Sequence, residues 1–242
     1  REVGREVGVP VCDSYSQLDA ARTSDEFDWR LLMSDAIHPN MDGHKRMAEQ
    51  LARTITGLHV SLGNVTPLRP AIPQTLARLK AGQPVRVLAM PPFDSLIEPA
   101  LKKFSPAAKV EVTSWPTGDL TLAKIEEDAK VKVRAMKPDL VLLAVPRTAT
   151  SDSDEAFAGS YGWVMNWSLN FGPPTWDCVV IHPSVFETTT DVQPRDELVR
   201  RLVRAQDLDL IDRPTGSSSK PETILQDWLA NQFESEVAEQ PH

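Results

Sequence analysis

The chain has 242 residues, which is enough to bury a sizeable apolar core in one large domain or in two smaller pieces. Apolar residues make up 41% and charged residues 25%, an ordinary globular composition that excludes the disordered and fibrous classes. The net charge is −8 at pH 7, and the lysines and arginines are interleaved with acidic residues, so we exclude a nucleic-acid partner. No apolar run approaches the roughly 18 residues that span a bilayer, and we expect no membrane span.

The first part of the chain has the pattern of a domain's end. Residues 1–8 read as the last turns of a helix, and the apolar run Val9–Asp13 predicts a parallel strand. Apolar residues at helical spacing from Met41 to Ile55 then predict a helix with Asn40 as its cap. Because the sequence starts on Arg1 and not on Met, we expect further chain upstream, and the compartment is left open between cytoplasmic and extracytoplasmic.

Residues 59–84 hold several prolines and polar residues and predict a linker, with a short helix at residues 74–80 left open. Beyond the linker, apolar runs alternate with helical patterns, which predicts a three-layer α/β/α fold around a five-stranded parallel sheet. The expected strands are Val85–Met90, Val110–Val112, Leu140–Val145, Cys178–Ile181 and Leu208–Ile211.

A weak internal repeat relates the two parts. Residues 1–13 resemble residues 200–212, since each is a helix end followed by an apolar run that ends on Asp, then a loop and an amphipathic helix. The chain therefore reads as the terminal strand and helix of one domain, residues 1–58, followed by the linker and a complete second domain of the same kind, residues 85–236.

Asp35 and His38 are the candidate catalytic residues. A serine esterase needs a base that takes the hydroxyl proton and returns it to the leaving group, and imidazole suits this because its pKa lies near neutrality. A carboxylate on the other ring nitrogen fixes the tautomer and stabilises the imidazolium. An Asp three residues before a His on one tight turn supplies both groups from a single loop.

The surrounding residues resemble a known family. The segment Ser34-Asp35-Ala36-Ile37-His38-Pro39-Asn40-Met41-Asp42-Gly43-His44 resembles the final conserved block of the SGNH (GDSL-type) esterase and lipase superfamily, which has the form Asp-x-x-His-Pro, a few residues, Gly-His. The resemblance implies a three-layer α/β/α fold, hydrolysis of an acyl or acetyl ester on a carbohydrate or lipid, His38 as general base and Asp35 as its orienting acid. It also implies no cofactor and a serine nucleophile located upstream of this chain, in the missing N-terminal part of the same domain.

The second domain keeps little of that family's site. The family has Gly-Asp-Ser after its first strand, a Gly after the second and Gly-x-Asn-Asp after the third. Here Asp94 and Ser95 follow the first strand with Phe93 in place of the Gly, and Gly118 follows the second. The segment after the third strand, Val145–Ala149, has neither Gly nor Asn, and no His follows the fifth. We therefore expect Ser95 and Gly118 to be remnants in a degenerate, inactive domain.

Two alternatives use the same loop differently. In a circularly permuted enzyme, Asp35 and His38 would activate Ser95, but a permutant needs no fifth strand of its own, and Leu208–Ile211 predicts one. A metal site of His38, Asp42 and His44 is disfavoured, since two histidines six residues apart do not share a helix face. We expect His44 to have a packing or capping role.

A third alternative is a non-enzymatic binding module, with carbohydrate as the candidate ligand. It predicts that Trp163, Trp167 and Trp176 are exposed beside the crevice of the second domain, whereas burial is the ordinary state of such residues. His182 follows the fourth strand and is interpreted as part of a structural turn. The two cysteines, Cys12 and Cys178, lie in apolar runs and are interpreted as buried thiols, with a disulfide left open.

Overall fold

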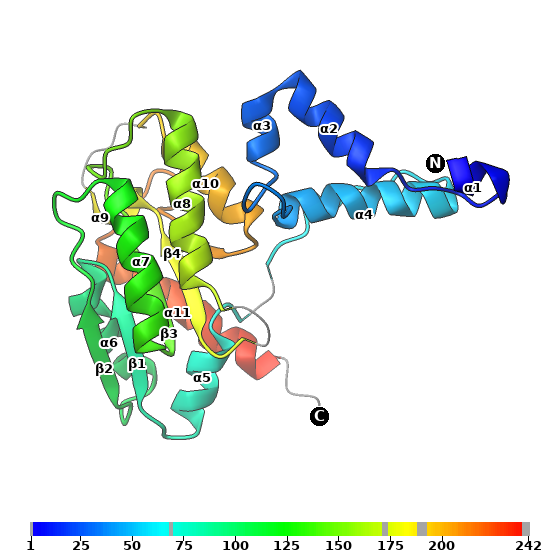
Figure 1. Cartoon of the computed structure of the whole chain (residues 1–242). Helices are drawn as coiled ribbons and strands as arrows, with labels where there is room; N and C mark the ends of the chain where they lie inside the picture. The colour runs from blue at the N-terminus through cyan, green and yellow to red at the C-terminus, as the bar shows by residue number, and fades with distance from the viewer. Residues whose placement is uncertain (1, 68–69, 171–173, 188–192, 239–242) are drawn as a thin grey trace. The chain divides into compact units, whose positions relative to one another are not determined.

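The computed structural model describes residues 2–67, 70–170, 174–187 and 193–238 (Figure 1). The chain divides into two compact units. We call residues 1–66 with Ala205–Asp207 the helical unit, and Pro67–Arg204 with Leu208–His242 the sheet unit. The predicted division into residues 1–58 and 85–236 concerned the evolutionary origin of each part, and that origin stays a prediction.

The sheet unit is built on five parallel strands in the order β2-β1-β3-β4-β5. The strands are β1 (Val85–Ala89), β2 (Val110–Ser114), β3 (Leu140–Leu143), β4 (Asp177–Ile181) and β5 (Asp209–Ile211). Every residue of β3 and β4 is buried, because these central strands have helices on both faces. The edge strand β2 instead exposes Glu111 and Ser114. The predicted α/β fold with a five-stranded parallel sheet is therefore confirmed.

Helices cover both faces of this sheet. On one face α7 (Leu122–Met136) packs against α8 (Asp154–Ser168), and on the other α6 (Phe93–Phe104) packs against α11 (Pro221–Ala238). Two further helices, α9 (Pro183–Phe186) and α10 (Asp196–Ala205), connect β4 to β5. Figure 1 shows α7 and α8 in front of the strands. Each apolar helix stripe is thereby buried against the sheet, which is what stabilises this layered fold.

The C-terminal part of the predicted linker, residues 73–80, belongs to the sheet unit. Helix α5 (Pro73–Lys80) buries Leu76 and Leu79 in the sheet unit, and Asp177 at the start of β4 accepts hydrogen bonds from two backbone N–H groups in the first turn of α5. A helix held by apolar burial and a buried carboxylate belongs to the domain and is not a linker. Residues 68–69 of the predicted linker lie outside the described residues.

The strand predicted at Val9–Asp13 is wrong, and with it the terminal strand expected before the second domain. The segment has no strand geometry, and Val9 and Val11 are about half exposed. A parallel strand exists only when neighbouring strands satisfy its backbone N–H and C=O groups. Within the described residues the helical unit offers no strand beside it, because its one β pairing is an isolated bridge between Met33 and Pro39.

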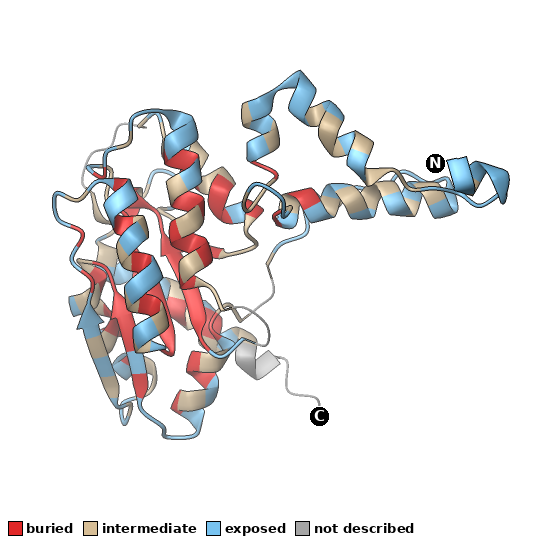
Figure 2. Cartoon of the chain, in the orientation of Figure 1, coloured by how far each residue is buried: buried red, intermediate tan, exposed pale blue. Residues whose placement is uncertain are grey.

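The helical unit consists of α1 (Glu2–Glu6), α2 (Ser14–Ser24), α3 (Glu26–Arg30) and α4 (Met41–Thr56). The helix expected from Met41 is thus confirmed, with Asn40 as its cap. Figure 2 shows that little of this unit is buried. Among the described residues, the sheet unit exposes one large apolar side chain, Val131. The helical unit exposes many more, namely Val3, Val7, Val9, Val11, Tyr15, Ile37, Met41, Leu51, Ile55, Leu58, Val60 and Val65. The helices of this unit therefore leave much of their apolar surface exposed to solvent and unpacked.

Cys12 is half-buried and Cys178 is buried in β4, and both are free thiols. The disulfide that the sequence left open is therefore not formed. None of the described helices is long and apolar enough to cross a membrane.

Candidate active site

The loop before α4 brings Asp35 and His38 together. His38 Nδ1 lies 2.7 Å from Asp35 Oδ2, and the other carboxylate oxygen accepts hydrogen bonds of 2.8 Å from the backbone N–H groups of Ile37 and His38. The hydrogen bond from His38 lowers the pKa of Asp35 below its ordinary value, aided by these two backbone donors. The carboxylate is therefore ionised at neutral pH and fixes the imidazole through Nδ1.

The opposite edge of the imidazole is open. The His38 side chain is 69% exposed, and within the described residues Nε2 makes no hydrogen bond. With Nδ1 bonded to a carboxylate, the neutral tautomer carries its proton on Nδ1 and leaves the Nε2 lone pair available. This is the state in which a histidine accepts a proton from a nucleophile.

Asn40 and Gly43 hold the loop in place. The loop closes on itself through the bond from Ser34 N to His38 O, and buried Asn40 donates its side-chain amide to Leu31 O and accepts from Gly43 N. A Cβ on Gly43 would collide with the Leu32 carbonyl oxygen and lie 2.8 Å from Pro39 Cβ. The absence of a side chain at Gly43 therefore allows the first turn of α4 to pack closely against the backbone of the loop that carries Asp35 and His38.

Gly43→Ala is expected to destabilise the helical unit by about 1–3 kcal/mol, because backbone atoms must shift to admit the methyl group. The matched control is Gly159→Ala in α8, where a Cβ meets nothing within 4 Å and the usual helix propensity should raise stability by up to about 1 kcal/mol. Urea denaturation followed by circular dichroism measures both. Two changes of the same sign would contradict the packing explanation.

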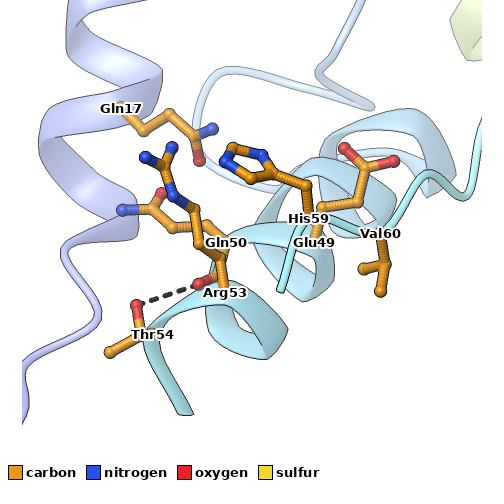
Figure 3. A pocket seen from close by; sticks show the side chains of 7 residues that line it. All are labelled: Gln17, Glu49, Gln50, Arg53, Thr54, His59 and Val60. Carbon is orange, nitrogen blue, oxygen red and sulfur yellow. Dashed lines mark hydrogen bonds between the residues drawn. The ribbon is translucent and has the colours of Figure 1, made fainter. Parts of the chain in front are cut away.

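Two hollows lie in the helical unit. One of about 410 Å³ borders the loop of Asp35 and His38, since Ala36 and Ile37 line it together with Trp29, Met33 and Tyr15. The other, of about 560 Å³, is drawn in Figure 3 and lies between α2, α4 and the segment after α4. Its lining is polar except for Val60, and the polar residues are Gln17, Glu49, Gln50, Arg53, Thr54 and His59. The first hollow has a mainly apolar lining and lies beside the loop that carries Asp35 and His38.

The sheet unit does not assemble a second active site around Ser95. Ser95 is in the first turn of α6, and its hydroxyl donates to Pro92 O at 2.9 Å. Phe93, at the position of the family's glycine, is fully buried and its ring packs edge-to-face against Phe186. Gly118 lies exposed in a turn with a positive φ of 31°. No described side chain gives Ser95 a base, so its hydroxyl is unactivated.

Arg147 lies in Val145–Ala149, the segment after β3 in which the sequence showed neither Gly nor Asn. Its guanidinium donates to both carboxylate oxygens of Asp196, at 3.0 and 2.9 Å, and to Glu187 at 3.2 Å. Burial by itself would raise the pKa of Asp196, but the hydrogen bonds from Arg147 lower it below the ordinary value. The segment after β3 is thus part of an ion-pair network that joins it to α10 and to Glu187.

His182 was expected in a structural turn, and its surroundings include two residues that the sequence did not connect with it. Its Nδ1 lies 2.8 Å from Ser184 Oγ and 3.3 Å from Asp212 Oδ1, and its Nε2 lies 3.2 Å from Asp196 O. A serine, a histidine and an aspartate therefore meet at the ends of β4 and β5. Both ring nitrogens are engaged and the side chain is fully buried, so no substrate reaches this histidine. These hydrogen bonds join Ser184 of α9 to Asp212 at the end of β5 and so hold α9 against the sheet.

The tryptophans do not form an exposed platform beside the crevice. Residues 161–167 belong to the regular helix α8, where Trp163 and Trp167 stack on each other with centroids 5.4 Å apart in its last turns. Trp176 is buried and donates its indole N–H to Ser168 O. Because α8 starts at the carboxyl ends of the strands, its last turns lie away from that edge. The binding-module alternative predicted that all three tryptophans are exposed, and for Trp176 this prediction is wrong because the side chain is buried.

His44 is exposed on α4, and within the described residues no group of three His, Cys, Asp or Glu side chains is arranged to hold a metal ion.

Comparison with known proteins supports the fold alone. No protein-family description and no curated protein sequence matches the chain. Among solved structures, it is similar to a two-domain esterase (CEX) active on acetylated mannans, co-crystallised with mannopentaose, with TM-score 0.53, 12% identity and coverage of 73% of this chain. The acetyl xylan esterase AlAXEase aligns with TM-score 0.40, 15% identity and coverage of 62% of this chain and 85% of its own length. The chain spans 56% of the length of the mannan esterase, and it shares an α/β fold with that enzyme.

Proposed function

We propose that this chain is part of a serine ester hydrolase of the SGNH type, in which His38 is the general base and Asp35 orients it. The proposal depends on one observation above all, the 2.7 Å contact between Asp35 Oδ2 and His38 Nδ1 with Nε2 left open. A carboxylate that positions an imidazole while its far nitrogen faces outward is the acid–base half of a serine hydrolase triad.

The serine and the oxyanion donors are proposed to come from a segment outside residues 1–242. The exposed apolar side chains of the helical unit support this, because a surface of this kind is suited to packing against a further layer of structure. On α4 alone, Met41, Leu51 and Ile55 are exposed, the last at 72%. We propose that a parallel sheet of the missing part packs on these residues and brings a serine to His38.

The reaction then follows from the geometry of the pair. His38 Nε2 takes the proton of the serine hydroxyl as its oxygen attacks the ester carbonyl, and the resulting imidazolium is stabilised by the Asp35 carboxylate. His38 next returns the proton to the leaving alkoxide, which departs and leaves an acyl-enzyme. A water molecule, deprotonated by the same nitrogen, hydrolyses the acyl-enzyme and regenerates the serine.

For the substrate we propose an acyl or acetyl ester, with acetylated carbohydrate as the first class to test. The support is the fold shared with an esterase active on acetylated mannans. The apolar hollow beside Ala36 and Ile37 is suited to an acyl group or to the apolar face of a sugar. The sheet unit, with an ion-pair network at its oxyanion position and no base for Ser95, is proposed as a degenerate second domain of the same family.

The direct test compares the full-length protein with residues 1–242 alone, using a fluorophosphonate probe and mass spectrometry of the labelled peptide. We expect the full-length protein to be labelled on a serine that precedes Arg1, and residues 1–242 to remain unlabelled. Labelling of Ser95 in residues 1–242 would contradict the proposal and favour the permuted enzyme. Absence of labelling in both proteins, with acetylated mannan and 4-nitrophenyl acetate left intact, would overturn the esterase assignment.

A further inference from the structure

The buried residues of the segment 2–66 gather at one place. Four residues of this segment are buried, namely Leu31, Leu32, Asn40 and Gly43. They lie at the two ends of the loop that carries Asp35 and His38, where α3 ends and α4 begins. Figure 2 shows how little else of α1 to α4 is buried. Because local stability follows burial, the ends of this loop are the most firmly held part of the segment.

Asn40 is the polar member of this buried group, and its amide is used at both ends. The residue is 4% exposed. Its Nδ2 donates to Leu31 O at 2.9 Å, and its Oδ1 accepts from Gly43 N at 3.1 Å. The backbone N–H of Asn40 donates in addition to Leu32 O at 2.9 Å. One residue therefore joins the two ends of the loop to each other and to the first turn of α4.

The two contacts of the amide require an acceptor and a donor in one side chain. The Gly43 N–H can only donate and the Leu31 carbonyl can only accept. Ser and Asp cap helices about as well as Asn does, since each can accept from the backbone of the first turn. Ionised Asp, however, has no donor for the Leu31 carbonyl, and Ser offers a single oxygen in place of two separate atoms. Helix capping alone therefore does not account for an asparagine at this position.

The backbone that Asn40 fixes is the backbone that orients Asp35 and His38. His38 O accepts from Ser34 N at 2.8 Å inside the loop, and His38 N donates to Asp35 Oδ1. The carboxylate of Asp35 thus takes its orientation from the loop backbone, and the imidazole of His38 takes its orientation from the carboxylate. A shift of the loop ends would therefore be passed on to the contact between Oδ2 and Nδ1.

We propose that Asn40 is a positioning residue, whose buried amide holds the loop in the conformation in which Asp35 Oδ2 meets His38 Nδ1. It acts through the loop backbone and takes no part in proton transfer. The expected effect on ester hydrolysis rests on the proposed function. The expected effect on the His38 ring does not, because it concerns only residues 31–43.

The first test is ¹⁵N NMR of the imidazole rings in residues 1–242, above the pH at which the rings titrate, with His38→Ala identifying the His38 signals. We expect the neutral His38 ring to carry its proton mainly on Nδ1, because the Asp35 carboxylate accepts there. In Asn40→Ser and in Asn40→Asp we expect the Nδ1–H fraction to fall toward the ratio measured for a histidine in a short peptide. Asp25→Ser, which changes the N-cap of α3, is the matched control and should keep the original ratio.

The second test is kinetic and uses the full-length protein. Asn40→Ser and Asn40→Asp should lower kcat on 4-nitrophenyl acetate about 10- to 100-fold, the cost of a misplaced reacting group, and leave KM within about threefold. Asp25→Ser should keep kcat within about twofold.

Several results would overturn the proposal. These are an original protein without a dominant Nδ1–H form, an unchanged ratio in both Asn40 variants, equal kcat losses in Asp25→Ser, and unfolding of both Asn40 variants as seen by circular dichroism, which would assign the amide to stability alone. A full-length protein that hydrolyses no ester would instead contradict the proposed function, and the NMR result would still decide the role of Asn40.

Discussion

Replacing His38 by alanine in the full-length protein is expected to lower kcat/KM for ester hydrolysis by at least about 10³-fold, because the proposed mechanism assigns to His38 the removal of the serine proton. Asp35→Asn should cost a factor of about 10²–10⁴. If the asparagine oxygen still accepts the hydrogen bonds from the backbone N–H groups of Ile37 and His38, the asparagine NH₂ group faces Nδ1 of His38. Nδ1 must then accept a hydrogen bond, so the neutral imidazole carries its proton on Nε2. That tautomer cannot accept the serine proton.

The matched control is His44→Ala, six residues further along the same segment, which removes an exposed histidine of α4 and should leave activity within about twofold of the original. Initial rates on 4-nitrophenyl acetate and on an acetylated mannan measure the effect. Circular dichroism establishes that each variant is folded. Full activity in His38→Ala would exclude this residue as the base, and equal losses in both histidine variants would point to a structural role for the loop.

Arg147→Met is expected to lower the unfolding free energy of the sheet unit by about 3–5 kcal/mol at pH 7, because it leaves the carboxylates of Asp196 and Glu187 without their cation. Asp196 is 7% exposed and Glu187 24%, so water compensates little. Lys102→Met is the control, since its pair with Glu98 is 44% exposed on both sides and should contribute less than about 1 kcal/mol.

The effect of Arg147 has a predictable pH dependence. The pKa of Asp196 is lower in the folded than in the unfolded protein, so the ion pair stabilises the fold above the unfolded value of about 4 and loses its contribution as the pH falls through the folded value. The difference in stability between the original protein and Arg147→Met should therefore shrink below about pH 4. Urea denaturation at pH 7, 5 and 3 measures this. A difference below about 1 kcal/mol at pH 7, or one that grows in acid, would contradict the argument.

Strands were predicted correctly from the sequence where the local apolar pattern matches the burial that the folded protein gives the segment. The apolar runs at β3 and β4 read as buried parallel strands because neither face meets water, and they are buried throughout. The same rule failed at Val9–Asp13, because an apolar run indicates a strand only where neighbouring strands are present to pair with it. The segment of α5 was included in the predicted linker because it is short and follows a run of prolines. Its apolar face is recognisable only from its contact with the sheet.

The contact between Asp35 and His38 could be expected from the sequence because both groups lie on one tight loop, where a spacing of three residues nearly fixes it, whereas their catalytic role stays a prediction. Asn40 and Gly43 hold that loop, through a cap hydrogen bond and through close packing of the backbone. Only the tertiary structure decided the rest. It brought together Arg147, Glu187 and Asp196, and also His182, Ser184 and Asp212, from the ends of different strands. It also left the Tyr161 hydroxyl buried without a hydrogen-bond partner. Such contacts join residues tens of positions apart, and their distances are set by how the helices pack on the sheet, which no local spacing encodes.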